Sequence, residues 1–227
     1  MTFDKEGFDK FILENQVVGI KEEPIKLKSG RESYWYANCR VLSDNYGLLN
    51  RTAGFVADFI KEKGLEFDYI YGTPDGATKL GVMVNIILGK DNPDLKMVVG
   101  RKKPKDYGEP RDRFFVGPVE KGDRVLVVED VTTTGSSVVE HLDFLKEAGV
   151  EIVGIISLFN RLEKRDDGMG VAEYIKKEFE VPYYWLSDGP RILSLAVKQS
   201  NLDECTIKKV VDNANEYLIE PIDESGG

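Results

Sequence analysis

The sequence predicts an α/β fold with a mostly parallel central sheet flanked by helices. Short β-branched or aromatic runs alternate along the chain with helical patterns, which is typical of that class. The 227 residues are 41% hydrophobic, enough to bury a core, and at roughly 100–200 residues per domain they fit one domain. Within 1–227 we expect a small N-terminal helix-plus-hairpin hood at 1–41, a core at 42–218 and a flexible tail at 219–227.

The hood is expected to contain a hairpin in IKLKSGRESYWYANCR, where Ser29-Gly30 is a turn signal between aromatic or β-branched arms. The next helix is predicted to be capped by Asp44 and ended by Gly64. A last strand, PYYWLS, and two helical patterns fall within 182–218. Between Gly64 and residue 182 we expect buried strands at 67–72, 95–100, 124–130 and 151–159, and crossover helices at 77–88 and 136–148.

Charge and cysteine content narrow the function classes. Lys and Arg number 31 against 40 Asp and Glu, a net charge of -9, which argues against binding of duplex nucleic acid. Cys39 and Cys205 are too few to staple a domain of this size and indicate free thiols in a reducing compartment. No stretch approaches a membrane span, and the N-terminus lacks the apolar core of a signal peptide. We therefore expect a soluble cytoplasmic protein with no nucleic-acid or membrane partner.

The chain has one histidine, His141, and no Cys/His cluster that would hold a soft metal such as zinc. His141 falls in the predicted helix 136–148. We interpret it as an amphipathic surface residue and not as a catalytic base.

The segment RVLVVEDVTTTGSS at 124–137 carries the strongest functional signal. An apolar strand ends in two adjacent acids, Glu129 and Asp130, and a loop rich in hydroxyl side chains then enters a helix. The free N–H groups and partial positive charge of a helix N-terminus can hold a phosphate. Carboxylates at the end of a strand can accept hydrogen bonds from sugar hydroxyls. The pattern predicts a sugar-phosphate site with the phosphate held by Thr132, Thr133, Thr134, Gly135, Ser136 and Ser137.

A plainer interpretation is that these hydroxyls only cap the helix and the acids are solvated. Two other phosphate loops do not fit, because the chain lacks the Gly-Lys-Ser/Thr ending of a Walker loop and the spaced glycines of the dinucleotide fingerprint. The segment instead resembles the phosphoribosyl pyrophosphate (PRPP) motif of type I phosphoribosyltransferases. The resemblance implies that Glu129 and Asp130 hold the ribose 2′ and 3′ hydroxyls while the loop holds the 5′-phosphate. Glu129 stands where the family usually has Asp.

The segment RKKPKDYGEPRDRFFVG at 101–117 places six basic and three acidic side chains within 101–113. A flexible basic loop suits closure over a polyanion, although it also fits a solvated surface loop. Its pattern resembles the catalytic loop of orotate phosphoribosyltransferases (OPRTs), which grips pyrophosphate across a dimer interface. The resemblance implies pyrophosphate binding by Arg101, Lys102 and Lys105. Tyr107 stands where the family commonly has His.

Three further segments extend the OPRT resemblance. IKLKSGRESYWY at 25–36 resembles the amino-terminal signature of the family, which implies that Lys28 lies near the orotate carboxylate. SLFNRLEK at 157–164 resembles the Asp-Arg-x-Glu segment, with Asn160 in place of Asp, and implies that Arg161 recognises the pyrimidine. YGTPDGATKLGV at 71–82 falls where the family binds pyrophosphate, which implies PRPP contacts for Asp75 and Gly76.

The resemblance implies transfer of the 5-phosphoribosyl group from PRPP to N1 of orotate, with Lys102, Lys105 and Asp130 as catalytic residues that act by positioning and electrostatics. Mg²⁺ is expected as cofactor, held mainly through PRPP oxygens, and a homodimer with shared active sites is implied.

Two alternative functions stay open. Tyr107, Asn160 and the changed 73–79 loop would suit another nucleobase, and a non-catalytic PRPP-binding regulator is the second. Residues 182–227 contribute no motif.

Overall fold

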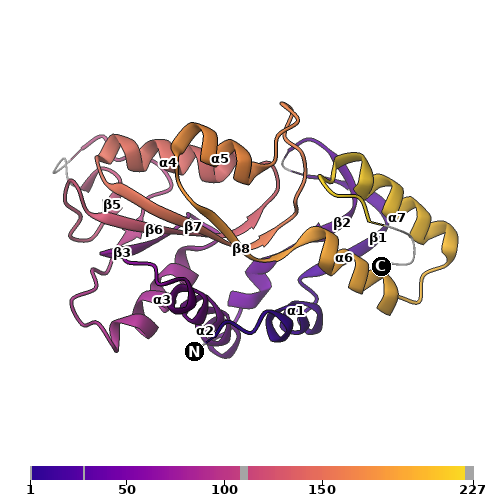
Figure 1. The fold of residues 1–227 in the computed structure, drawn as a ribbon, viewed down its shortest axis with the longest axis horizontal. Coiled ribbons are helices and arrows are strands. Elements are labelled where there is room, and N and C mark those ends of the chain that lie inside the picture. The colour runs from indigo at the N-terminus through magenta and orange to yellow at the C-terminus, as the bar shows by residue number, and fades with distance from the viewer. Residues whose placement is uncertain (1, 28, 108–111, 223–227) are drawn as a thin grey trace.

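Four parallel strands form the central sheet in the computed structural model, which describes residues 2–27, 29–107 and 112–222 (Figure 1). Every neighbouring pair in this sheet is parallel. The carboxyl ends of the strands therefore meet at one edge, where α/β folds bind ligands. The strands, in spatial order, are β3 (Tyr69–Gly72), β6 (Arg124–Thr132), β7 (Glu151–Asn160) and β8 (Tyr183–Asp188).

Helices cover both faces of the sheet (Figure 1). Helices α2 (Tyr46–Lys63) and α3 (Thr78–Gly89) lie on one face, and α4 (Ser136–Ala148) and α5 (Val171–Phe179) lie on the other. Successive side chains of a strand point to opposite faces. In β6, Leu126 and Val128 accordingly join the core on the α2/α3 side, and Val125 and Val127 join the core on the α4/α5 side. Burial of both faces explains the continuous apolar run of this strand and confirms the predicted fold class.

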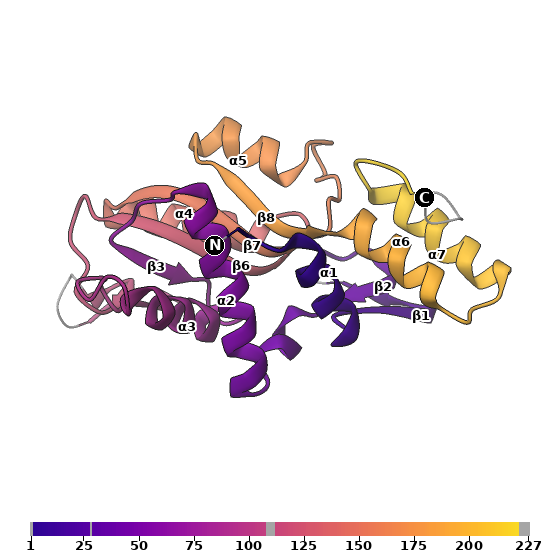
Figure 2. The ribbon, with the colours of Figure 1, turned by 60° about the horizontal axis from the view of Figure 1, so that its bottom comes forward.

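The N-terminal hood contains α1 (Lys5–Glu14) and the antiparallel hairpin of β1 (Val18–Lys26) and β2 (Glu32–Ala37), as predicted. Helices α6 (Gly189–Gln199) and α7 (Glu204–Tyr217) lie beside this hairpin in both ribbon views (Figures 1 and 2), with α7 against β2 and α6 against β1. The C-terminal helices, which carry no motif and were predicted to belong to the core at 42–218, thus pack on the hood. A short 3-10 helix, η1 (Cys39–Ser43), connects the hairpin to α2.

The predicted strand at 95–100 is shorter than expected and lies outside the central sheet. Only β4 (Val99–Gly100) is extended, and it pairs antiparallel with β5 (Phe115–Val116). The Lys96 N–H donates to the Asp68 carbonyl at 3.0 Å, and β4 also contacts β3, so this segment runs beside the central sheet without joining it. Pairing with β5 closes the ends of the basic segment, which becomes the connection of a long hairpin.

Three local predictions differ from the structure. Helix α2 is capped by Asn45, whose side chain accepts from the Leu48 N–H at 3.0 Å, and not by Asp44. Helix α5 was not expected, because its N-cap, Gly170, makes no side-chain cap bond and gives no start signal. In the predicted flexible tail, Ile222 exchanges two hydrogen bonds of 2.8 Å with the Asn215 side chain, while 223–227 lie outside the described residues.

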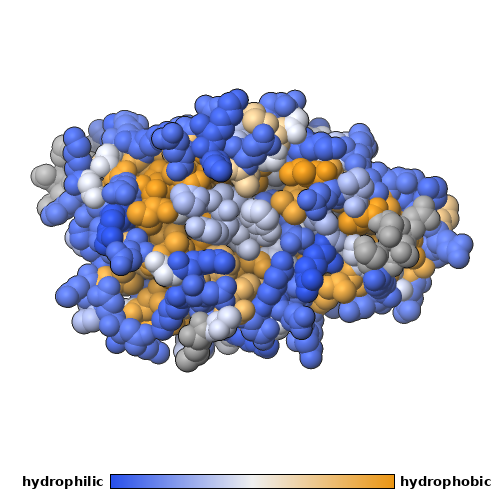
Figure 3. Space-filling model, viewed as in Figure 1, coloured by the Kyte–Doolittle hydropathy of each residue, from blue (hydrophilic) through white to orange (hydrophobic). Residues whose placement is uncertain are grey.

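Other boundaries agree with the predictions. Gly64 and Gly149 end α2 and α4 in the left-handed conformation, and α4 spans the predicted 136–148. Cys39 and Cys205 are free thiols, one buried and one exposed. Within the described part of the chain, no helix is long and apolar enough to cross a membrane. The face seen in Figure 3 is mostly hydrophilic, with apolar side chains gathered in separate patches between the charged ones.

Candidate active site

A pocket lies at the carboxyl edge of the sheet, where β6 turns into α4. Every predicted residue of the acid pair and of the 132–137 loop lines it, and Ser29, Tyr36 and Arg40 reach it from the hood side. Gly135 permits the turn, because its φ is +76° and a Cβ there would lie 2.3 Å from Val171 Cγ2. The structure therefore brings the predicted phosphate loop and the acid pair into one pocket.

The two acids of the pair have different surroundings. Glu129 is buried, and its Oε1 accepts from Thr73 Oγ1 at 2.8 Å and from the Asp130 N–H at 3.0 Å. Its Oε2 has no hydrogen-bond partner among the described residues. Burial, followed by the charge of Asp130, raises the pKa of Glu129 well above its ordinary value. Asp130 instead accepts from the Val131 N–H at 2.8 Å and from Arg40 Nε at 3.4 Å.

The 73–76 loop lies directly against the acid pair. A Cβ on Gly76 would be 2.3 Å from Asp130 Oδ2, so only glycine fits beside this carboxylate. Asp75 forms an ion pair with Lys102. The hydrogen bond from Lys102 is the main cause that lowers the pKa of Asp75. Lys102 is thus linked to the pocket through the loop that the sequence predicted to bind pyrophosphate.

None of the predicted cations Arg101, Lys102 and Lys105 lines the pocket itself. Arg101 Nε donates to the Asp112 carbonyl at 2.8 Å. Lys105 Nζ lies 4.3 Å from the centre of the Tyr107 ring, and the backbone N–H of Lys105 donates to the Arg113 carbonyl at 2.8 Å. Residues 108–111 of this loop lie outside the described residues. Of the three predicted pyrophosphate binders, only Lys102 contacts the loop next to the acid pair.

Arg161 also lines the pocket. Its side chain is 2% exposed, and its guanidinium carbon lies 3.5 Å from the centre of the Trp35 ring. Burial lowers the pKa of Arg161, and the adjacent carboxylate of Glu163 opposes this effect. Lys28, the other residue predicted to bind the base, lies outside the described residues, while its neighbour Ser29 lines the pocket.

Sequence reasoning missed Arg40 and misplaced His141. Arg40 follows the hairpin without any motif of its own, and only the fold reveals its contact with Asp130. His141 is 4% exposed and lies 2.9 Å from the Tyr71 hydroxyl through Nδ1, so the predicted surface position is wrong. It shares the buried face of α4 with Leu142 and Leu145, and that spacing was visible in the sequence.

No cluster of three or more His, Cys, Asp or Glu side chains suited to a metal ion occurs within the part of the chain that the structure describes. The acidic side chains at the pocket are Glu129 and Asp130, and Oε2 of Glu129 is buried without a hydrogen-bond partner among the described residues. This donor set fits a metal that is held partly by a substrate, as Mg²⁺ commonly is.

Comparisons with known proteins agree with this geometry. A family model described as "Phosphoribosyl transferase domain" matches residues 47–188. The orotate phosphoribosyltransferase of Pyrococcus furiosus is 38% identical over 174 residues, which cover 77% of this chain and 87% of that protein. The solved structure of the Francisella tularensis OPRT has a TM-score of 0.72 and 26% identity, covering 93% of this chain and 99% of that one.

The solved structure of the Mycobacterium tuberculosis OPRT in complex with PRPP has the same fold, with a TM-score of 0.60 and 21% identity over 83% of this chain and 98% of that one. The chain therefore belongs to the phosphoribosyltransferase domain family and, within it, to the orotate phosphoribosyltransferases.

Proposed function

We propose that this protein transfers the 5-phosphoribosyl group from PRPP to N1 of orotate, giving orotidine 5′-monophosphate and pyrophosphate. One observation carries the proposal: a single pocket is lined by the phosphate loop, the acid pair and Arg161, so a sugar phosphate and a base have adjacent places. The likeness to the Pyrococcus furiosus enzyme supports orotate as the base.

In this reaction the bond from C1 of the ribose to pyrophosphate breaks, and its electron pair leaves with pyrophosphate. The bond from N1 of orotate to C1 forms, and the N1 proton is released. Because negative charge accumulates on the leaving group, the residues act mainly by positioning and electrostatics. The N–H groups at the start of α4 bind the 5′-phosphate, Glu129 and Asp130 accept from the ribose hydroxyls, and Lys102 and Lys105 bind pyrophosphate.

The proposal includes a divalent cation and a partner subunit. Asp130, together with PRPP oxygens, would hold Mg²⁺, which would neutralise part of the pyrophosphate charge. Arg101 and Lys105 lie off the pocket wall of this chain, which is compatible with a homodimer whose basic loops serve shared sites. The two free cysteines support a cytoplasmic location.

The first test is turnover of orotate by the purified protein with PRPP and Mg²⁺, followed by the loss of orotate absorbance. Asp130→Asn and Lys105→Ala should each lower kcat by about a hundredfold or more, since each removes a charge from the reacting centre. Asp143→Asn, an exposed acid on α4, and Lys103→Ala, in the same basic loop, are the matched controls. Circular dichroism should show all four variants folded.

A panel of other bases separates the alternatives. Turnover of a purine or of uracil, with orotate left unconsumed, would show that the protein acts on that nucleobase and not on orotate. PRPP binding without turnover of any base would favour a regulator. Wild-type rates in Asp130→Asn and Lys105→Ala would remove both residues from the site.

A further inference from the structure

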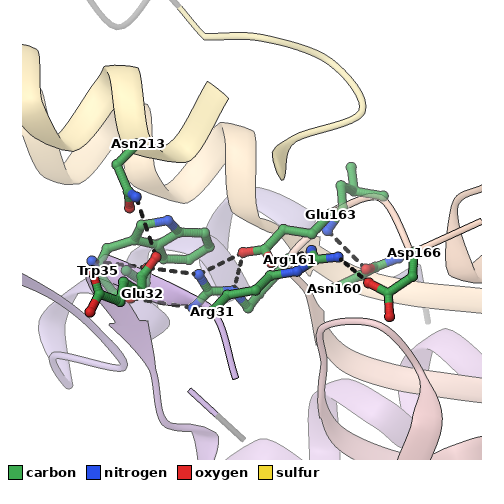
Figure 4. Close-up of polar contacts among 10 residues, drawn as sticks. Arg31, Glu32, Trp35, Asn160, Arg161, Glu163, Asp166 and Asn213 are labelled. Carbon is green, nitrogen blue, oxygen red and sulfur yellow. Dashed lines mark hydrogen bonds and ion pairs between the residues drawn. The ribbon is translucent and has the colours of Figure 1, made fainter. Parts of the chain in front are cut away.

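A buried ionic triad of Arg161, Glu163 and Arg31 joins the hood to the segment after β7 (Figure 4). Arg161 Nε donates to Glu163 Oε1 at 2.6 Å, and Arg31 Nη1 donates to Glu163 Oε2 at 3.4 Å. One carboxylate therefore bridges two guanidinium groups. Arg161 makes further contacts to the hairpin, with Nη2 donating to Ser33 Oγ at 3.1 Å and Nη1 to the Trp35 carbonyl at 3.4 Å.

These contacts fix the Arg161 guanidinium in one place. Its plane is held on the Trp35 ring, and two of its edges are held by Glu163 and Ser33. A planar fork that is preset in this way loses little conformational entropy when it binds a ligand. Without the carboxylate of Glu163, the Arg161 side chain would lose its charged partner and part of its orientation.

The triad carries a surplus positive charge. The exposed fraction of the side chain is 2% for Arg161, 3% for Glu163 and 13% for Arg31, so water screens their charges weakly. Two guanidinium groups against one carboxylate leave a net charge of about +1. Arg31 also contacts Asp166 at 3.2 Å, but that carboxylate is fully exposed and its charge is screened by solvent. A buried surplus of positive charge is stabilised by an anionic ligand.

Helix α7 contacts the triad and the segments on either side of it. The Tyr217 ring lies 4.8 Å from the guanidinium carbon of Arg31. Its carbonyl accepts from the Lys164 N–H at 2.7 Å, which ties the 161–164 segment to the end of the helix. Asn213 accepts from the Tyr34 N–H at 3.1 Å and so ties α7 to β2. The C-terminal helix therefore connects both segments that meet at Arg161.

We propose that Glu163 and Arg31 are positioning residues that hold Arg161 against Trp35, and that the surplus charge of the triad selects an anionic base over a neutral one. The choice of orotate as that base rests on the proposed function. The positioning of Arg161 does not, because it is a property of the free protein.

Kinetics test the selection. Arg31→Gln removes the surplus charge and should raise the KM for orotate about tenfold, while the KM for PRPP stays within about twofold of wild type. Arg31→Lys keeps the charge but loses the fork, and should recover part of the loss. Uracil, which lacks the carboxylate, should keep its inhibition constant against orotate in Arg31→Gln. Asp166→Asn alters only the exposed partner of Arg31 and should match wild type.

Fluorescence tests the positioning without any ligand. The chain has two tryptophans, so Trp185→Phe leaves Trp35 as the single tryptophan, which is excited selectively at the long-wavelength edge of the absorption band. In that background Glu163→Gln and Arg31→Gln should each change the Trp35 emission, since the guanidinium stacked on the ring moves, whereas Asp166→Asn should not. If Glu163→Gln fails to fold, the less buried Arg31→Gln decides the question.

The outcomes separate the two proposals. Absence of orotate turnover in the wild-type protein would overturn the proposed function, and the Trp35 emission would still decide the positioning. Unchanged emission and an unchanged KM for orotate in Arg31→Gln would overturn the positioning. An equal rise of the KM values for PRPP and orotate would indicate a merely structural role and would overturn the selection.

Discussion

Glu129 is a buried carboxyl whose ionisation opposes folding. Burial and the neighbouring charge of Asp130 raise its pKa above the ordinary value of 4.5, so the folded chain holds a proton that the unfolded chain releases. The stabilisation from this proton is fully present below pH 4.5 and is lost as the pH rises through the raised pKa. We predict that Glu129→Gln, which keeps an oxygen for Thr73 but cannot ionise, becomes more stable than wild type as the pH rises.

The difference in free energy of unfolding should grow by about 1.4 kcal/mol for each pH unit over which only the folded wild type holds the proton. Urea denaturation of both proteins at several values between about pH 5 and pH 8 measures it. Glu66→Gln, an exposed carboxyl, is the control. A difference that stays constant over this range would contradict the prediction.

At the residue scale, the site could be predicted where its chemistry is local in sequence. Glu129, Asp130 and the loop 132–137 lie on one strand–loop–helix unit, so their spacing alone places them together. Arg40 reaches Asp130 from 90 positions away. Such a contact depends on how the hood packs on the sheet. Local patterns do not contain that information.

At the scale of elements, only one of two neighbouring polar residues caps the start of α2. Asn45 accepts from the Leu48 N–H, and Asp44 is the exposed residue that ends η1. We predict that Asn45→Ala destabilises the fold by about 1 kcal/mol, since a free N–H of the helix loses its partner. Asp44→Ala is the matched control and should cost only a few tenths of that. Equal losses in the urea midpoints of the two variants would contradict the assignment of the cap.

Elements with clear end signals and apolar spacing were predictable, and those without were not. Helix α4 has Gly135 before it and Gly149 after it, and its bounds follow from the sequence. Helix α5 begins after Gly170 with no capping side chain, so its start is set by packing of Val171 and Ile175 on the core. The segment at 95–100 has the apolar composition of a core strand, but its pairing with β5 depends on partners 15 and 17 residues away.

At the scale of the whole molecule, the pocket lies between two parts of the structure, the sheet with its helices and the hood. The sheet and its helices provide the phosphate loop and the acid pair, while the hood provides Tyr36, Arg40 and, through Trp35, the support for Arg161. Helices from the C-terminal end of the chain pack on the hood. The alternation of strands and helices predicts the first part. The second requires α7 to pack on a hairpin that lies more than 160 residues earlier, as the contact of Asn213 with Glu32 and Tyr34 shows.

Charge is distributed unevenly over the molecule, and this leads to a prediction about salt. The chain has a net charge of -9, yet 101–113 holds six basic and three acidic side chains. Salt screens both the long-range repulsion of a polyanion by the acidic body and its attraction to the basic loop. The local attraction should dominate, because a bound pyrophosphate lies well within the Debye length of about 10 Å at 0.1 M from the loop cations, whereas the other charges are spread over the surface.

The KM for PRPP should therefore rise between about 0.05 M and 0.5 M NaCl, and the KM for orotate, which has a single carboxylate, should rise less. Lys102→Gln should flatten the salt dependence for PRPP, because Lys102 is the loop cation that contacts Asp75 beside the acid pair. Lys103→Gln removes the same charge from the next position and should leave most of the dependence in place. A KM for PRPP that does not change with salt, or equal flattening in the two variants, would show that binding follows net charge and not the placement of one lysine.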